Sequence, residues 1–406
     1  MDMGASLERH VANLLTVLAV GESGSMTAAS RTNLKATSAI SRSVQELELE
    51  VGKPLFERTA RGVRETEYGK IILERAARLR DELDSAADAV FRAVPRGKQP
   101  SRHRTRAVLA SGRKLKMIAD ICELRSIGAA AQRIGMSQAG VSMAIGRVEA
   151  ALGIDLFIRR NEGVAPTEAA EILAGCASRV VAELRHLQAD LLSITGSVGG
   201  TIVVGTTHLG RSYSFPVAIA AAIERHPYIR VRQVEGSYRH LVGQLRAGEI
   251  DVLFGVLREG DLGGGLVGEP LFVDRMSVLA GAGHPLASRG KLDLADLTRE
   301  KWILPSPNSV GLDQVEACFR GLGLPVPRSS VETGDLATLR QLLETDNMVA
   351  IASPRQLAFE IRAGVVVELP VEFEVPGIEV GLIHRASALM PQAALALIEE
   401  VRRLAA

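Results

Sequence analysis

Hydrophobic positions in the first half of the chain follow a helical period that short turns interrupt. Apolar residues recur every three or four positions over 115–122, which predicts an amphipathic helix. A second helix is predicted over 129–134 and a third over 137–149, whose first residue is a serine suited to an N-cap. Residues 156–164 then suggest a strand, a basic turn and a returning strand. This succession predicts a helix-turn-helix followed by a β-hairpin wing.

The same pattern occurs twice in the chain. Residues 14–69 match residues 115–170 without a gap, and the members of each matched pair are 101 positions apart. The identical pairs include Leu14/Leu115, Ser25/Ser126, Ala29/Ala130, Ser41/Ser142, Gly52/Gly153, Leu55/Leu156, Phe56/Phe157, Arg58/Arg159, Gly62/Gly163, Val63/Val164 and Thr66/Thr167. We therefore predict two winged helix-turn-helix units from one duplication, unit one at 8–69 and unit two at 107–169.

A long amphipathic helix is predicted after each unit, over 70–94 and over 170–195. The apolar residues that share one face are Ile72, Leu79 and Leu83 in the first helix, and Leu173, Val180, Leu184, Leu187 and Leu191 in the second. Between the first of these linker helices and unit two, the segment 95–106 has two prolines, one glycine and no apolar residue. Its composition predicts a basic tether.

After Gly199 and Gly200 the pattern changes to apolar strands that alternate with helices. The predicted strands are 201–205, 230–236, 251–256, 302–304, 329–332 and 348–352, and the predicted helices are 215–226, 238–247, 311–321 and 336–343. This alternation is typical of doubly wound sheets. We predict a multidomain fold in which two all-α winged units with linker helices precede a two-lobed α/β domain at 200–406.

Composition narrows the class of protein. A chain of 406 residues with 47% hydrophobic content has room for several cores. Cys122, Cys176 and Cys318 lie far apart, so neither a zinc site nor a disulfide framework is indicated, and no cofactor is expected. The N-terminus lacks the pattern of a signal peptide, and no apolar run reaches about 18 residues. These features favour a cytoplasmic protein.

Charge is distributed unevenly along the chain. Residues 1–194 contain 28 Lys and Arg against 23 Asp and Glu, whereas residues 195–406 contain 20 against 24. A basic front half indicates a polyanionic partner. The stretch from Pro95 to Lys116 holds eight basic residues and no acidic one, but residues 117–194 alone are slightly acidic. Charge alone therefore does not establish that unit two binds nucleic acid.

Unit two resembles the winged helix-turn-helix of the LysR-type transcriptional regulators, whose signature is close to A-A-x-R-L-x-x-S-Q-x-x-V-S-x-x-I-x-x-L-E-x-x-L-G-x-x-L-F-x-R. The matching residues are Ala130, Ala131, Arg133, Ile134, Ser137, Gln138, Val141, Ser142, Ile145, Val148, Glu149, Leu152, Gly153, Leu156, Phe157 and Arg159. Unit one matches less well, because Asn33 replaces an apolar residue and Ala36-Thr37 replaces Ser-Gln. It still retains Ile40, Ser41, Arg42, Leu47, Glu48, Gly52, Leu55, Phe56 and Arg58.

The resemblance implies a DNA-binding role for the third helix and the wing of each unit. The candidate residues are Ser137, Gln138, Ser142, Arg159 and Arg160 in unit two, and Thr37, Ser38, Ser41, Arg42, Arg58 and Arg61, with Ser43 and Arg64 beside them, in unit one. Amides and hydroxyls hydrogen-bond to base edges, whereas arginines neutralise phosphates. Any single one of these residues also fits an ordinary solvated surface.

The C-terminal half resembles the LysR effector domain through the segments 235–237, 245–251 and 284–286. In such lobes small ligands lie beyond the carboxyl ends of the strands, near helix N-termini. The candidate effector-binding residues are Thr206, Thr207 and Ser237 in lobe one, and Ser306, Asn308 and Thr333 in lobe two. Each hydroxyl also fits a plain helix cap. The resemblance to the galactose-binding-protein regulator subgroup favours a sugar or an organic acid as the effector.

The leading hypothesis is a transcription regulator, not an enzyme, that binds double-stranded DNA under the control of a small-molecule effector. The resemblance also implies linker helices that pair between subunits, and thus a homodimer or homotetramer. One alternative is a small-molecule-binding α/β protein or enzyme whose tandem units serve only for oligomerisation, although the chain has no G-x-S-x-G, H-E-x-x-H or P-loop motif. Another is that one unit, more plausibly unit one, has lost DNA binding.

Overall fold

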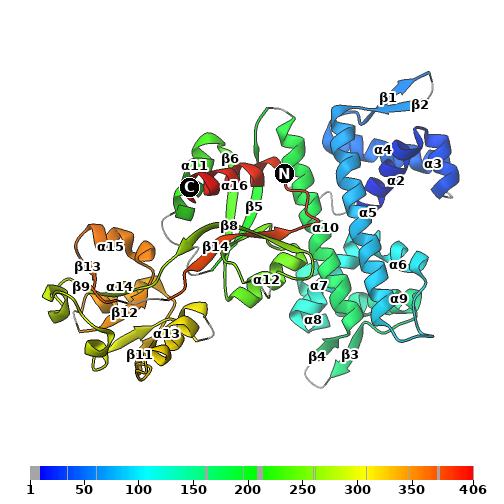
Figure 1. Cartoon of the computed structure of the whole chain (residues 1–406). Helices are drawn as coiled ribbons and strands as arrows, with labels where there is room; N and C mark the ends of the chain where they lie inside the picture. The colour runs from blue at the N-terminus through cyan, green and yellow to red at the C-terminus, as the bar shows by residue number, and fades with distance from the viewer. Residues whose placement is uncertain are drawn as a thin grey trace.

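The computed structural model describes residues 10–405, apart from 34, 61, 161–162, 195, 208–213, 259, 261, 308, 346 and 373–374. Two winged units lie at one end of the molecule and a two-lobed α/β domain extends to the other, with a pair of long helices between them (Figure 1). No helix among the described residues is both long and apolar enough to cross a membrane.

Both winged units have the predicted order of elements. Unit one consists of α2 (Val11–Ser23), α3 (Met26–Asn33), α4 (Thr37–Val51), β1 (Phe56–Thr59) and β2 (Gly62–Glu65). Unit two consists of α7 (Gly112–Leu124), α8 (Ile127–Ile134), α9 (Gln138–Leu152), β3 (Phe157–Arg160) and β4 (Gly163–Pro166). The apolar residues that the repeat places in register on the helices are buried in both units, because each helix packs the same face on its neighbours, whereas those on the wings, Phe56, Val63, Phe157 and Val164, are half-buried.

The wings are fastened to the helices by the same polar contacts in both units. In unit one, the Glu48 carboxylate accepts a hydrogen bond from the amide of Leu55 at 2.8 Å, and Glu149 accepts one from Leu156 at the same distance in unit two. A glutamate at the end of the third helix therefore holds the start of each wing. The duplication thus extends from the sequence to individual hydrogen bonds.

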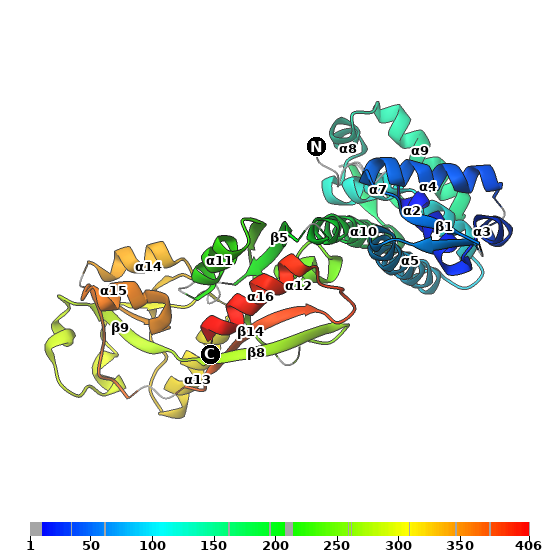
Figure 2. The ribbon, with the colours of Figure 1, turned by 90° about the horizontal axis from the view of Figure 1, so that it is seen from above.

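The linker helices α5 (Glu67–Ala93) and α10 (Glu168–Ser193) pack against each other within the chain (Figures 1 and 2). They run antiparallel, since Arg75 near the start of α5 pairs with Glu183 far along α10 at 3.0 Å, while Glu82 pairs with Arg179 at 2.6 Å. This corrects the expectation that each linker helix pairs with a second subunit. The duplication supplies the partner helix within one polypeptide.

The expected tether at 95–106 is partly helical. Helix α6 (Arg102–Leu109) begins inside it and buries Val108 and Leu109. Arg102 forms an ion pair with Asp88 of α5 at 3.1 Å and lies over the ring of Phe91, 5.1 Å from its centroid. Arg106 likewise pairs with Asp84 of α5. Two basic residues of the expected tether therefore hold the connection against α5, because that helix offers carboxylates and an aromatic ring.

The α/β domain contains two five-stranded sheets, one in each lobe. Lobe one has the strand order β6-β5-β7-β14-β8, from β5 (Gly199–Thr206), β6 (Tyr228–Glu235), β7 (Val252–Val256), β8 (Leu266–Asp274) and β14 (Ile378–Arg385). Lobe two has the order β11-β10-β12-β9-β13, from β9 (Ser277–Gly281), β10 (Trp302–Leu304), β11 (Ser329–Glu332), β12 (Val349–Ala352) and β13 (Val366–Glu368). The chain therefore crosses between the lobes twice, after β8 and before β14.

Helices cover both sheets. Lobe one carries α11 (Ser214–Arg225), α12 (Tyr238–Ala247) and α16 (Gln392–Ala405), and lobe two carries α13 (Val310–Gly321), α14 (Leu336–Leu343) and α15 (Ala358–Arg362), with 3-10 turns η4 (Pro285–Ser288), η5 (Leu294–Leu297) and η6 (Pro354–Leu357). The parallel strands and their helices match the alternation in the sequence. The antiparallel strands β8, β9, β13 and β14 were not predicted, since the expected pattern was one of parallel strands with connecting helices.

Possible metal ligands are dispersed over the described part of the chain. No group of three or more His, Cys, Asp and Glu side chains there is arranged to hold a metal ion. Burial raises the pKa of both Cys122 and Cys176 to about 12, which keeps these thiols protonated and unreactive.

Candidate DNA interface and effector pocket

The third helices of the two units, α4 and α9, each bury one face and expose the other. The buried face consists of Ile40, Val44 and Leu47 in α4, and of Val141, Ile145, Val148 and Leu152 in α9. The candidate DNA-binding residues lie away from it: Thr37, Ser38, Arg42, Ser137 and Gln138 are exposed, and Ser41 and Ser142 are half-buried. We call α4 and α9 the recognition helices because this exposed polar face is open to a partner.

The N-terminal ends of the recognition helices differ. In α9, the Ser137 hydroxyl accepts a hydrogen bond from the amide of Gly140 at 3.1 Å, which caps the helix. The equivalent residue before α4 is Ala36, which has no side chain able to cap. Part of the hydrogen-bonding capacity of Ser137 is thus already used within unit two.

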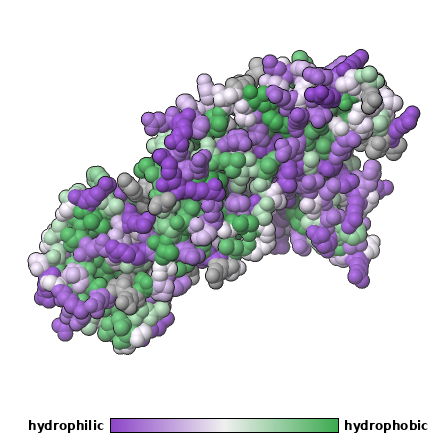
Figure 3. Space-filling model, turned by 45° about the horizontal axis from the view of Figure 1, so that its top comes forward, coloured by the Kyte–Doolittle hydropathy of each residue, from purple (hydrophilic) through white to green (hydrophobic). Residues whose placement is uncertain are grey.

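The wings present arginines to solvent. Arg58, Arg159 and Arg160 are exposed, and none of the three is paired with a carboxylate from another described residue. Arg61 lies outside the described residues. Figure 3 shows that hydrophilic side chains predominate on the end of the molecule that holds the winged units. Unpaired, exposed guanidinium groups beside a polar helix face are suited to phosphate oxygens.

The exposed face of α9 also includes two residues that were not singled out from the sequence. Met143 is 61% exposed and Arg147 is exposed beside it on the same helix face. Their spacing could have identified them from the sequence. Ala139, Met143 and Arg147 are four residues apart and so share one face of the helix, and the opposite face is apolar.

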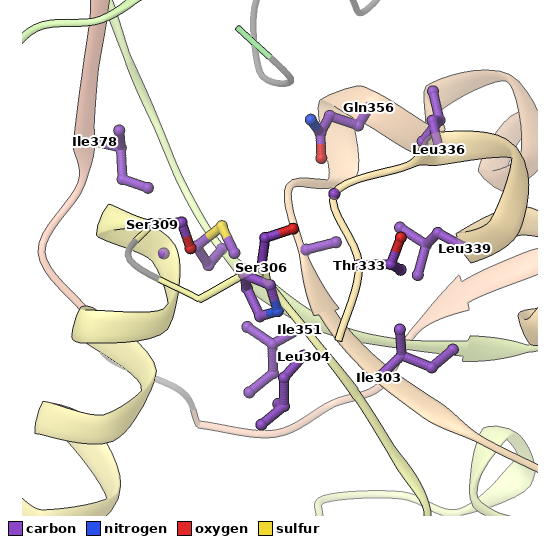
Figure 4. Close-up of a pocket in the computed structure, with 15 residues that line it drawn as sticks. Ile303, Leu304, Ser306, Ser309, Thr333, Leu336, Leu339, Ile351, Gln356 and Ile378 are labelled. Carbon is purple, nitrogen blue, oxygen red and sulfur yellow. The ribbon is translucent and has the colours of Figure 1, made fainter. Parts of the chain in front are cut away.

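A cavity of about 100 Å³ lies in lobe two near the boundary between the lobes (Figure 4). Ser306 and Ser309 border it at the start of α13, and Thr333 and Gln356 border it from the opposite side. In Figure 4 the polar ends of Ser306 and Gln356 point toward each other across the space. The remaining lining is apolar or glycine, namely Met276, Ile303, Leu304, Pro305, Gly311, Gly334, Leu336, Leu339, Ile351, Ala352 and Ile378. None of the described side chains that line this cavity is charged.

The structure brings only some of the candidate effector residues together. Ser306 and Thr333 share the cavity of lobe two, whereas Asn308 lies outside the described residues. Ser309 and Gln356 were not predicted, although a serine directly before a helix is a recognisable N-cap, and Ser309 does accept a hydrogen bond from Leu312 at 3.2 Å.

The lobe-one candidates lie elsewhere. Thr206 is completely buried and its hydroxyl accepts a hydrogen bond from the Gln233 amide at 2.9 Å. Thr207 is 9% exposed and packs beside Gly255, while Ser237 caps α12. None of these three residues borders the cavity that Ser306 lines. The side chain of Thr206, at the end of β5, points into lobe one, whereas Ser237 is exposed at the start of α12.

Buried charges join the linker helices to lobe one. The Arg75 guanidinium, 3% exposed, donates to Glu183 at 3.0 Å and to Asp190 at 2.7 Å, and also to the carbonyl of Leu389 ahead of α16 at 2.8 Å. This side chain therefore contacts both linker helices and the effector domain.

A second buried junction lies nearby on α10. Asp251 accepts hydrogen bonds from Arg185 at 2.6 Å and from the amide of Val203 at 2.8 Å, and lies 2.7 Å from His186. Burial opposes ionisation of Asp251, but the contacts with His186, Arg185 and Val203 outweigh it and lower the pKa of the carboxyl. The ionised carboxylate thus ties α10 to the central strands of lobe one.

Two family models match the chain. The LysR substrate binding domain matches residues 195–406, and the bacterial regulatory helix-turn-helix protein, lysR family, matches twice, at 11–70 and 113–171. The HTH-type transcriptional regulator GalR of Pseudomonas putida is 35% identical over 401 residues, which are 98% of this chain and 98% of GalR. That match spans both winged units.

Solved structures share the fold over a smaller part of the chain. A full-length OxyR variant from Pseudomonas aeruginosa has a TM-score of 0.52 and 23% identity, and covers 71% of this chain and 93% of its own. Full-length CbnR complexed with its target DNA has a TM-score of 0.52 and 20% identity, and covers 72% of this chain and 99% of its own. Each is matched almost completely, yet leaves more than a quarter of this chain unmatched.

Proposed function

The chain belongs to the LysR family of DNA-binding, effector-responsive transcription regulators, and on that premise we propose that α4 and α9 both bind operator DNA. The observation that carries this proposal is the same in both units: a recognition helix with an exposed polar face beside a wing whose arginines have no carboxylate partner among the described residues. The protein would act in the cytoplasm, where chromosomal DNA is accessible.

We assign different tasks to the helix and the wing of unit two. Gln138 at the start of α9 reads base edges, whereas Arg159 and Arg160 neutralise phosphates without regard to sequence. Removing both arginines is expected to weaken binding to every duplex alike and to reduce the slope of log affinity against log salt by about two. Gln138→Ala is expected to relax preference at one base pair, with a discrimination loss of about 1–3 kcal/mol.

The test is a titration of operator and random duplexes over a range of salt concentrations. The matched control removes Arg289 and Arg328, two exposed arginines of lobe two, and so changes the net charge equally. If that control lowered the salt dependence as much as loss of the wing arginines, phosphate contact by the wing would be excluded. If Gln138→Ala weakened all duplexes equally, base reading by that amide would be excluded.

We propose further that the effector is a small organic acid with an apolar body, bound in the lobe-two cavity. A carboxylate suits the N-terminus of α13, where Ser306 and Ser309 stand beside backbone amides. Apolar residues form most of the remaining wall and suit a hydrocarbon or ring. A sugar fits less well, because its many hydroxyls need more polar partners than the cavity offers.

Calorimetry with benzoate and 2-methylpropanoate, against glucose as the sugar probe, tests the class of effector. Ser306→Ala is expected to weaken carboxylate binding about tenfold or more. Ser237→Ala is the matched control, since Ser237 caps α12 outside this cavity. Tight binding of glucose with no carboxylate binding would overturn the assignment, and so would equal losses in the two variants.

A further inference from the structure

Two of the contacts between α5 and α10 are related as they would be in an interface between two identical subunits. Because matched positions differ by 101, Arg75 corresponds to Cys176, and Glu82 corresponds to Glu183. Arg75 contacts Glu183, and the corresponding contact also exists, since the Cys176 thiol lies 3.9 Å from the carbonyl oxygen of Glu82. Each of these contacts therefore joins the counterparts of the two residues in the other contact. Such paired contacts are characteristic of an interface with a twofold axis.

This arrangement places both recognition helices on one side of the linker pair. In Figures 1 and 2, α4 and α9 lie on the same side of α5 and α10, and the wings β1–β2 and β3–β4 project from opposite ends in Figure 1. Two recognition helices related by a twofold axis are the geometry that reads two inverted half-sites on one duplex. Helix-turn-helix dimers obtain that geometry from two chains.

We propose that a single chain forms the complete paired reader, and that it binds one operator with two unlike half-sites, one for unit one and one for unit two. This inference rests on the proposed DNA-binding function and deepens it. Two half-sites read by identical subunits are symmetric, whereas the surfaces of α4 and α9 differ. The operator is therefore an imperfect inverted repeat, with half-site centres separated by a whole number of turns, each of roughly 10 base pairs.

The connection between the units supports pairing within the chain. Only residues 94–101 separate α5 from α6, and α6 is fixed to α5 of the same chain by the ion pairs Arg102–Asp88 and Arg106–Asp84. Helix α6 also packs against α9 of unit two. Unit two is thus attached through a short connection to the linker helix of unit one, which favours pairing inside one polypeptide over exchange with another.

Differences in the exposed faces support unlike half-sites. At matched positions, Arg42 of α4 corresponds to Met143 of α9, and Glu46 corresponds to Arg147. All four side chains are exposed. An arginine side chain binds guanine, whereas a methionine offers only apolar contact, so the two helices cannot prefer the same bases. Ser41 and Ser142 are identical and give the half-sites a common element.

Hydroxyl-radical footprinting on an operator selected with the full chain tests this proposal. Two variants are compared, Thr37→Ala with Arg42→Ala in unit one, and Gln138→Ala with Arg159→Ala in unit two. Each is expected to lose protection over a different half-site and to bind the operator at least about tenfold less tightly. An equal mixture of the variants is expected to remain as weak as either one, because neither chain has two intact recognition helices. Thermal melting confirms that the exposed substitutions leave the fold intact.

The alternative pairing gives different results. If unit two paired with unit two of another chain, the unit-one variant would protect both half-sites as the unaltered chain does, and the operator would be symmetric. If instead unit one of one chain and unit two of another chain bound the same operator together, the mixture of the two variants would regain full protection, because each variant would supply its intact unit. Either result would overturn the single-chain reader. Failure of the underlying DNA-binding proposal is distinct from both, since neither variant would then change binding to any duplex.

Discussion

Units one and two share the residues that fix the backbone and differ in the residues that face outward. Glu48 and Glu149 hold the two wings through equivalent hydrogen bonds, and Thr66 and Thr167 cap the two linker helices. On the exposed faces, by contrast, Arg42 is replaced by Met143 and Glu46 by Arg147. The comparison indicates that both units fold under the same local constraints while their recognition surfaces have diverged.

The linker helices show a second asymmetry. Arg75 of α5 reaches two carboxylates of α10 and a carbonyl of lobe one, whereas its counterpart on α10 is Cys176, a small apolar thiol. The single effector domain is therefore connected to the two units unequally. Among the substitutions considered below, removal of this arginine is expected to have the largest effect on stability.

We expect Arg75→Ala to destabilise the linker pair by about 3–5 kcal/mol. The substitution leaves Glu183 buried without its positive partner, and an unpaired buried charge is strongly unfavourable. Urea unfolding followed by far-ultraviolet circular dichroism reports the helices. Fluorescence of Trp302, the single tryptophan, reports lobe two and is expected to change much less.

Arg80→Ala is the matched control for this prediction. Arg80 is on the same helix, but its ion pair with Glu22 is exposed, with side-chain exposures of 39% and 54%. Exposed ion pairs contribute about 0–1 kcal/mol. Equal losses of stability in the Arg75 and Arg80 variants would show that burial of the Arg75 cluster is energetically unimportant.

Substitution of the two wing glycines by alanine tests whether both wings require the same backbone conformation and the same close approach to a neighbouring carbonyl oxygen. Gly62 has φ +137° and Gly163 has φ +126°, values that favour glycine. A Cβ atom at Gly62 would lie 2.3 Å from the carbonyl oxygen of Gly24, and one at Gly163 would lie 2.5 Å from that of Arg125. Both substitutions are expected to cost about 1–3 kcal/mol, since the backbone itself must shift.

Hydrogen exchange locates this effect. The amide of Val63 donates to Gly24 at 2.9 Å and that of Val164 donates to Arg125 at 3.0 Å, so each amide is expected to exchange faster only when the glycine of its own wing is replaced. Gly146→Ala serves as the control, because nothing lies within 4 Å of a Cβ there and alanine favours a helix. Faster exchange in one unit but not the other would contradict equivalent wings.

The repeated pattern explains why so much of this fold was predictable. Helical periodicity, the 101-residue spacing and the alternation of strands and helices all depend on neighbours in sequence, and the main elements of both units and the parallel strands followed from them. The pairing of α5 with α10 did not, because an apolar helix face does not specify whether its partner belongs to the same chain. Helix α6 was not predicted, because the segment in which it begins is basic and contains two prolines, a composition typical of a tether.

The effector cavity was less predictable than the recognition helices for a related reason. A recognition helix is local, so its capping serine and periodic face identify it. The cavity is assembled from distant segments, including Met276 and Ile378 near the two crossings between lobes and Gln356 after β12. Hydroxyl residues at strand ends suggested that both lobes contribute to the effector site, yet the side chain of Thr206 is buried inside lobe one. Sequence alone does not fix such a direction.

The smallest expected effect concerns the start of each recognition helix. Ser137→Ala removes the cap of α9 and is expected to reduce stability by about 1 kcal/mol, whereas Ala36→Ser supplies a hydroxyl at the start of α4 and is expected to increase stability by a similar or smaller amount. Unit two thus loses its N-cap serine, and unit one gains a serine at the matched position. Thermal melting of each variant, with Ser38→Ala as a control inside α4, measures the difference. If Ala36→Ser failed to stabilise unit one, its weaker match to the family signature would reflect more than a lost cap.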